Sequence, residues 1–364
     1  MKFRRRSRSN VFAAILWLMA WPELMAAEIR SVLLTAQQVT DQELQQARDA
    51  GLTSVVLQLT SVKPDVQQQE RTAAEKIAQT GLKLDYWIEI ARCPELADVH
   101  PEWMASLQGH PEWRRFFPDA PLPAKGEVIK NYPWVPILYQ EAFDAHRNRV
   151  AQLLTDLPPP SMVYLNGLQG APSACGCGNS LCRWTADYGP ILTATRIKAN
   201  AAVSFVKAVE VLIPHATVIP VWLTECEKHD CTQEGLCSGV GCFDGICWKA
   251  WEKQLTPLAR HADLIGVFAP YKQFQRDLPL YGGSGAWVSH CVKSFAEMPV
   301  RHGGKAIAAN RLVTAIQAWD VTEQELNSQL QHMQHSGAAG YVLIKQQIDQ
   351  SWSPLLYSVT PPRQ

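Results

Sequence analysis

Short apolar runs alternate with amphipathic segments along most of the chain. The run IRSVLLTA (29–36) predicts a buried strand, and TDQELQQARDAG (40–51) predicts a helix that Thr40 caps and Gly51 ends. The same two patterns recur without an obvious internal repeat. We expect eight strands, at 29–36, 53–61, 82–91, 161–167, 217–225, 263–271, 305–311 and 339–346. Each strand but the last is followed by a helical segment, at 40–51, 68–80, 141–156, 186–212, 248–261, 287–297 and 322–336.

This alternation favours a parallel sheet, and eight units match the size of a closed (β/α)₈ TIM barrel. We therefore expect one barrel domain over residues 28–350. A doubly wound open sheet is the alternative, but no phosphate-binding loop supports it, because Gly282-Gly283-Ser284-Gly285 follows no strand directly. The expected departures from the repeat are a long loop at 92–136, Cys-rich loops at 168–185 and 226–247, and a C-terminal tail at 351–364.

The N-terminus has the pattern of a secretory signal peptide. Five basic residues precede an apolar run from Val11 to Trp21, and Met25-Ala26-Ala27 offers a cleavage site. The 11 apolar residues of this run are too few for a stable membrane span, which needs roughly 20. We expect residues 1–27 to direct export to the periplasm or the medium.

Removing that segment changes the charge of the chain. The full sequence has 34 basic and 34 acidic side chains, and the segment removes five basic residues and one acidic residue, Glu23. The remaining chain is slightly acidic. A nucleic-acid partner is not expected, because binding to phosphate backbones depends on a basic surface.

Candidate chemistry lies at the carboxyl ends of the expected strands, where TIM barrels place their active sites. Period-2 alternation in strand 82–91 turns Asp85, Trp87 and Glu89 toward the barrel axis, with Glu89 at the mouth. The same reasoning places four further polar residues on inward positions near strand ends: Gln58, Asn166, Asn310 and Lys345. The alternative is that these polar residues only cap strands, or that Glu89 and Lys345 form a buried ion pair without chemistry.

Glu225 is a second candidate carboxylate at the end of strand 217–225. If the strand is regular, alternation groups Glu225 with Leu223 and turns it toward the helices. If the strand ends before Cys226, the carboxylate can turn into the mouth.

The loop at 92–136 is rich in proline and aromatic residues. Loops of this length in a compact domain are usually functional or disordered, and the aromatic content argues against disorder. The loop is interpreted either as a lid with a ring that stacks on a sugar, or as a segment packed onto the barrel. Its aromatic residues are Trp103, Trp113, Phe116, Phe117, Tyr132 and Trp134.

Ten cysteines follow the expected signal peptide, and in an exported chain an even number favours disulfides. Eight of them lie in the loops after strands four and five, which are neighbours at the rim of a barrel. The disulfide candidates are Cys93, Cys175, Cys177, Cys182, Cys226, Cys231, Cys237, Cys242, Cys247 and Cys291. A structural zinc site of Cys175, Cys177 and Cys182, with Cys226 or His229 as the fourth ligand, is the alternative. No other cofactor is expected.

Several short phrases give the chain a family resemblance. HPEW after strand three, CGCGNSLCRW after strand four and GAAGYVLIK at the last strand resemble poorly characterised, glycoside-hydrolase-like secreted TIM barrels. In the better-known retaining barrels of this kind, the acid/base residue ends strand four and the nucleophile ends strand seven. Here those ends carry Asn166 and Asn310, so the resemblance does not transfer the catalytic pair.

Two functions remain open at this point. The first is a glycoside hydrolase acting on a carbohydrate at the barrel mouth, which needs two carboxyl groups. Glu89 would be the acid or base, Glu225 the second carboxyl group, and Gln58, Trp87, Asn166, Asn310 and Lys345 would bind substrate. The alternative is a barrel that binds a carbohydrate or another small polar ligand without cleaving it.

Overall fold

The computed structural model describes residues 29–105, 118–168, 191–223, 257–271, 282–297, 305–348 and 353–358. The predicted signal peptide and the cysteines of the two Cys-rich loops lie outside these ranges.

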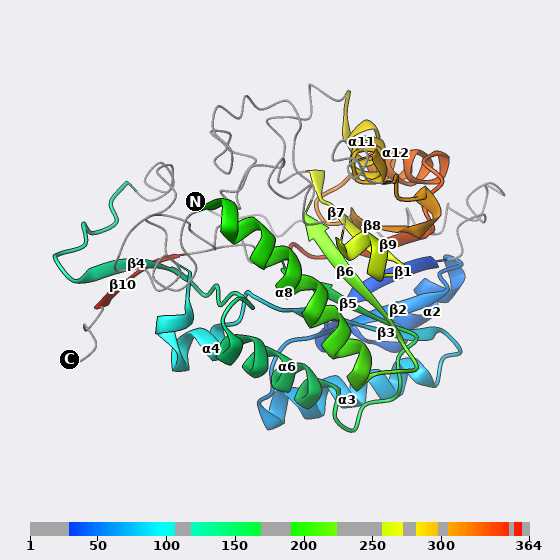
Figure 1. Ribbon diagram of the computed structural model, residues 1–364. Coiled ribbons are helices and arrows are strands. Elements are labelled where there is room, and N and C mark those ends of the chain that lie inside the picture. The colour runs from blue at the N-terminus through cyan, green and yellow to red at the C-terminus, as the bar shows by residue number, and fades with distance from the viewer. Residues whose placement is uncertain are drawn as a thin grey trace, which may run out of the picture.

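Eight parallel strands form a closed barrel (Figure 1). In order around the barrel they are β1 (Ile29–Leu34), β2 (Ser54–Leu59), β3 (Lys83–Glu89), β5 (Met162–Asn166), β6 (Thr217–Leu223), β7 (Ile265–Ala269), β8 (Leu312–Gln317) and β9 (Gly340–Ile344). The barrel closes where β1 pairs with β9 in parallel, with Ile29 opposite Gly340 and Leu33 opposite Ile344. The predicted (β/α)₈ TIM barrel is therefore confirmed.

Helices follow seven of the barrel strands, as the sequence predicts, and form the outer layer in Figure 1. Thr40 caps α2 by accepting a hydrogen bond from the backbone N–H of Glu43, and Thr322 forms a capping box with Glu325 at the start of α12. The helices are α2 (Asp41–Asp49), α3 (Pro64–Ala78), α6 (Gln140–Leu154), α8 (Ile191–Leu212), residues 257–261, α11 (Ser284–Glu297) and α12 (Glu323–His335). No helix in the described part of the chain is long and apolar enough to cross a membrane.

Alternation along each strand separates two apolar layers. The larger layer lies between the strands and the helices and includes Tyr86, Ile88, Trp222 and Leu343. The smaller layer fills the barrel interior, where the Trp87 ring stacks on Tyr164 with ring centroids 5.7 Å apart. The interior is a packed core that supports the mouth from below.

The predicted strand at 305–311 is wrong, and its correction moves Asn310. Residues 305–308 are outside the sheet, and Ala309–Arg311 form the 3₁₀ helix η7 just before β8. Arg311 anchors this turn by donating to the backbone carbonyls of Ala259, Ala262 and Asp263. The buried strand is the next apolar run, LVTAIQ, so Asn310 lies at its amino end, opposite the mouth.

The segment between β3 and β5 leaves the barrel and forms elements of its own. These are α4 (Pro94–Val99), the 3₁₀ helix η4 (Pro101–Trp103) and β4 (Glu127–Tyr132). The strand β10 (Ser353–Ser358) comes from the expected C-terminal tail and pairs antiparallel with β4, outside the ring in Figure 1. Sequence periodicity missed both strands because neither has the alternation of a half-buried strand: β4 buries the polar residues Lys130 and Asn131, and β10 has no buried position.

Gly340 is required where the barrel closes. A Cβ atom built on Gly340 would lie 1.9 Å from the backbone oxygen of Ile29, which is the residue paired with it in β1. We predict that Gly340→Ala lowers the free energy of unfolding by more than about 3 kcal/mol, at the high end for one substitution.

A matched glycine variant controls for backbone strain. Both glycines have a positive φ, of 159° at Gly340 and 81° at Gly81, but a Cβ atom on Gly81 would meet nothing within 4 Å. Gly81→Ala should therefore cost only about 1–2 kcal/mol. Urea denaturation of the two variants measures the difference. An equal loss of unfolding free energy in both would contradict the close contact between Gly340 and Ile29.

Candidate functional site

The Glu89 carboxyl group is held at the carboxyl end of β3 by two side chains that donate hydrogen bonds. Trp87 Nε1 donates to Glu89 Oε1 at 2.7 Å, and Asn166 Nδ2 lies 2.9 Å from Oε1 and 3.0 Å from Oε2. Asn166 ends β5 and stands opposite Glu89 in the register of the two strands. A carboxylate with this support has a fixed position, which is what proton transfer to a bound ligand requires.

Burial raises the pKa of the Glu89 carboxyl group above its ordinary value. The hydrogen bonds from Trp87 and Asn166 oppose this shift, as do the positive charges of Arg92 and Arg149. Burial is the largest of these effects, so Glu89 keeps its proton to a higher pH than an exposed glutamate does.

Two further predicted residues share the inward phase with Glu89. Gln58 follows Val56 at the end of β2 and lies opposite Trp87 in the sheet register. Trp87 itself is fully buried, and its ring packs against Tyr164 and Phe268. In this structure Trp87 therefore supports Glu89 from below, and its ring does not face the mouth.

Two predicted residues lie away from the mouth. Lys345 follows β9, where Val342 and Ile344 occupy the inward positions, so Lys345 turns outward and its Nζ lies 2.6 Å from Glu43 Oε2 on α2. The prediction for Lys345 is wrong because it assumed that the odd-numbered residues of this strand face inward, whereas the even-numbered ones do. Asn310 is excluded by its position at the amino end of β8.

Glu225 lies outside the described residues. The described part of β6 nevertheless corrects the phase assumed for this strand. Trp222 belongs to the outer layer and Val221 to the barrel interior. The inward positions of β6 are therefore the odd-numbered ones, the reverse of the assignment from sequence.

Sequence reasoning missed Gln317, which ends the seventh barrel strand. It continues the inward phase of Val313 and Ala315, is fully buried, and donates through Nε2 to the backbone oxygen of Trp319 at 3.1 Å. The apolar run LVTAIQ could have predicted that Gln317 ends a strand, but we had placed this strand at 305–311 instead.

The described residues hold two of the ten cysteines, Cys93 and Cys291, and both are buried. Cys93 has a free thiol, so it is not the disulfide partner that the sequence predicted, and burial raises the pKa of this thiol. No disulfide links the described residues. The other eight candidates, including the zinc candidates Cys175, Cys177, Cys182 and Cys226, lie outside them. Within the described ranges, no group of three His, Cys, Asp or Glu side chains could hold a metal ion.

The described aromatic residues of the segment 92–136 pack locally. The rings of Trp103 and His100 are stacked with centroids 3.7 Å apart, and Trp134 is buried against Ala91, two residues after Glu89. Trp113, Phe116 and Phe117 lie outside the described residues, so the lid stays a prediction.

Asp85 is a second inward carboxyl group on β3, deeper in the barrel. It is fully buried, and its Oδ1 accepts a hydrogen bond from the backbone N–H of Met162 at 2.9 Å. Burial raises the pKa of Asp85 to about 6, although hydrogen bonds from Ser54 and Met162 oppose the shift. Because Trp87 separates Asp85 from the mouth in the order of the strand, Asp85 belongs to the core and not to the candidate site.

Comparisons with known proteins support the fold alone. No family model and no curated protein matches the chain. Among solved structures, the GH42 β-galactosidase Gan42B from G. stearothermophilus has a TM-score of 0.52 at 11% identity over 87% of this chain and 51% of that one. A β-galactosidase from the psychrophilic Marinomonas ef1 has a TM-score of 0.51 at 11% identity, over 86% and 53%. An endo-1,4-β-D-mannanase from Thermotoga petrophila RKU-1 has a TM-score of 0.48 at 10% identity, over 87% and 88%.

The present chain thus spans about half the length of the two β-galactosidases it matches. The likeness supports the TIM-barrel fold of this chain.

The raised pKa of Asp85 gives a testable dependence of stability on pH. Its pKa rises from 3.8 in the unfolded chain to about 6. The stability that protonated Asp85 contributes is therefore complete below about pH 4 and is lost as the pH rises through 6. We predict that Asp85→Asn gains about 3 kcal/mol relative to the wild type between pH 3 and pH 7. Urea denaturation at several pH values measures this, and a difference that does not change with pH would contradict it.

Proposed function

We propose that this barrel acts on a carbohydrate at its mouth and that Glu89 is the group that transfers a proton. One observation carries the proposal. Among the described ends of the eight barrel strands, Glu89 is the one carboxyl group that alternation turns inward at the carboxyl end. TIM-barrel enzymes draw their reactive groups from this position.

The state of Glu89 suits the first half of glycosidic hydrolysis. Cleavage needs one carboxylic acid that protonates the leaving oxygen, and a raised pKa keeps such an acid protonated near neutral pH. Once the proton is transferred, the N–H groups of Trp87 and Asn166 stabilise the carboxylate that remains. The amides of Gln58 and Asn166 offer groups that can bind sugar hydroxyls.

The second carboxyl group is proposed from the sequence. Hydrolysis needs a group that attacks the sugar or activates water. Glu225 is the candidate because it follows the fifth barrel strand, and in an unbroken strand it would have the inward phase of Val221. Export, which residues 1–27 predict, would give the protein access to polysaccharides outside the cytoplasm.

A binding protein without hydrolytic activity is the second candidate function. The fourth and seventh barrel strands end in the amides Asn166 and Gln317, where the retaining barrels it resembles carry their catalytic pair. Amides at both positions favour hydrogen bonding to a ligand over chemistry on it.

The variant Glu89→Gln separates the two functions. A panel of plant and algal polysaccharides is screened with the wild type for released reducing ends, and binding is measured in parallel by calorimetry. If Glu89 transfers the proton, Glu89→Gln should lower the rate by about 10²–10⁴-fold with folding intact, because the amide cannot titrate.

The control is Glu75→Gln, a matched change at an exposed position of α3, and it should keep the full rate. A folded Glu89→Gln variant with full activity would reject the assignment and make Glu225→Gln the next variant to test. Binding without release of reducing ends by the wild type would support the binding protein.

A further inference from the structure

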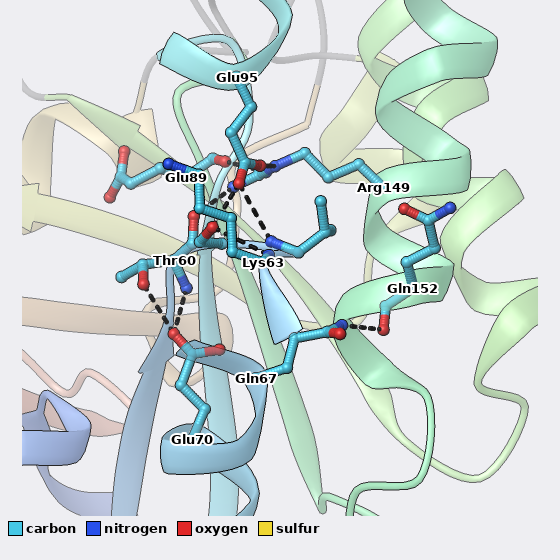
Figure 2. A network of polar contacts seen from close by, with 10 residues as sticks. Thr60, Lys63, Gln67, Glu70, Glu89, Glu95, Arg149 and Gln152 are labelled. Carbon is cyan, nitrogen blue, oxygen red and sulfur yellow. Dashed lines mark hydrogen bonds and ion pairs between the residues drawn. The ribbon is translucent and has the colours of Figure 1, made fainter. Parts of the chain in front are cut away.

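One guanidinium group joins the ends of β2 and β3 from outside the barrel. Arg149 lies on α6, and its side chain is 7% exposed. Its Nη1 donates to the backbone oxygen of Glu89 at 3.0 Å, and its Nη2 donates to the backbone oxygen of Thr60, just after β2, at 2.9 Å. Figure 2 shows Arg149 reaching from its helix toward both strand ends.

Glu95 on α4 balances the charge of Arg149. Its Oε2 lies 3.2 Å from Arg149 Nε, and its Oε1 accepts from the Ser61 hydroxyl and from the backbone N–H of Val62 at 3.1 Å. All three nitrogen atoms of the guanidinium therefore have a partner: Nε contacts Glu95, and Nη1 and Nη2 contact the two backbone oxygens. A lysine has a single nitrogen atom and cannot replace this planar group.

The end of β2 is fixed independently by Glu70 on α3. Glu70 Oε1 accepts from both the backbone N–H and the hydroxyl of Thr60, each at 2.7 Å. Arg149 therefore connects the end of β3 to a strand end that is already held (Figure 2).

We propose that Arg149 is a positioning residue for Glu89: it holds the backbone of residue 89 from the helix layer, with Glu95 as its counter-charge, so that the carboxyl group on the inner face meets Asn166. This inference rests on the proposed function of Glu89. Arg149 would thus act on the position of Glu89 from the helix layer, without contacting the Glu89 carboxyl group. Small displacements of a reacting group cost much of the rate, which is why such a support matters.

The charged groups around Glu89 allow a test in which two variants should shift the pKa of Glu89 in opposite directions. Arg92 follows β3 and Arg149 comes from α6, and both lower the pKa of Glu89 against the larger effect of burial. Removing the charge of Arg149 should raise the pKa of Glu89 further. Removing the charge of Glu95 leaves Arg149 without its counter-charge, which should lower the pKa of Glu89.

The experiment compares Arg149→Gln, Arg149→Lys and Glu95→Gln in the full chain with Arg147→Gln as control. Arg147 lies on the same helix and pairs with Asp144 at a half-buried position, so its loss removes the same charge without touching β3. The titration of Glu89 is followed by ¹³C NMR of carboxyl-labelled glutamate, and the spectrum of Glu89→Gln assigns the resonance. The pH profile of kcat/KM is measured on whichever polysaccharide the wild type cleaves.

We expect the Glu89 titration to move to higher pH in Arg149→Gln, to lower pH in Glu95→Gln and not at all in Arg147→Gln. Arg149→Lys keeps the charge but loses the fork, so it should leave the titration nearer the wild type while kcat/KM falls by about 10²-fold. If Arg149→Gln does not fold, the lysine variant and Glu95→Gln carry the same test.

The result that would overturn the inference is a Glu89 titration and a kcat/KM that stay at wild-type values in the folded variants. Failure of all three variants to fold would also overturn it, because Arg149 and Glu95 would then be structural. The proposed function fails separately. If the wild type cleaves no polysaccharide, the hydrolase assignment is lost, while opposite NMR shifts still show that Arg149 and Glu95 act on the protonation of Glu89.

Discussion

The hydrogen bond between Asn166 and Glu89 is the interaction on which the candidate site depends, because it joins two strands that are neighbours only in the folded barrel. Residues 90–161 lie between them in the chain and build α4, β4 and α6 outside the sheet. The segment must leave the barrel after Glu89 and return at Met162, and it does so without taking the place of a barrel strand. Closure by β1 and β9 then fixes the ring that turns the inward residues toward one mouth.

Two layers of contacts act on Glu89 from opposite sides. Inside the barrel, Trp87 and Asn166 bind the carboxyl group itself, and the apolar core around Trp87 excludes water. Outside, Arg149 binds the backbone oxygen of the same residue and carries the charge that partly offsets desolvation. Burial is the larger influence, so the group favours its neutral form, yet donors are already in place for the anion. This combination suits a group that gives up a proton and takes it back.

Much of this arrangement could be predicted from the sequence, and the failures have physical causes. Period-2 alternation placed Trp87, Glu89 and Asn166 correctly because their strands have clear apolar partners on the outer face. It failed for Asn310 because apolar residues before the 3₁₀ helix η7 were taken for the strand itself. It failed for Lys345 because the inward positions of β9 are those of Val342 and Ile344, which turns residue 345 outward. Arg149 and Glu95 could not be found this way, because their roles depend on contacts between α6, α4 and strand ends far apart in sequence. The pairing of β10 with β4 is a long-range contact of the same kind.

The most direct test of this account is the titration of Glu89 in the wild-type protein. Carboxyl ¹³C NMR with the resonance assigned by Glu89→Gln reports the protonation of this one side chain across the pH range. We predict a midpoint above the ordinary glutamate value of 4.5, because burial outweighs the hydrogen bonds and nearby charges. A midpoint at or below 4.5 would show that burial does not favour the neutral form and would contradict the proposed role of Glu89 as a proton donor at the barrel mouth.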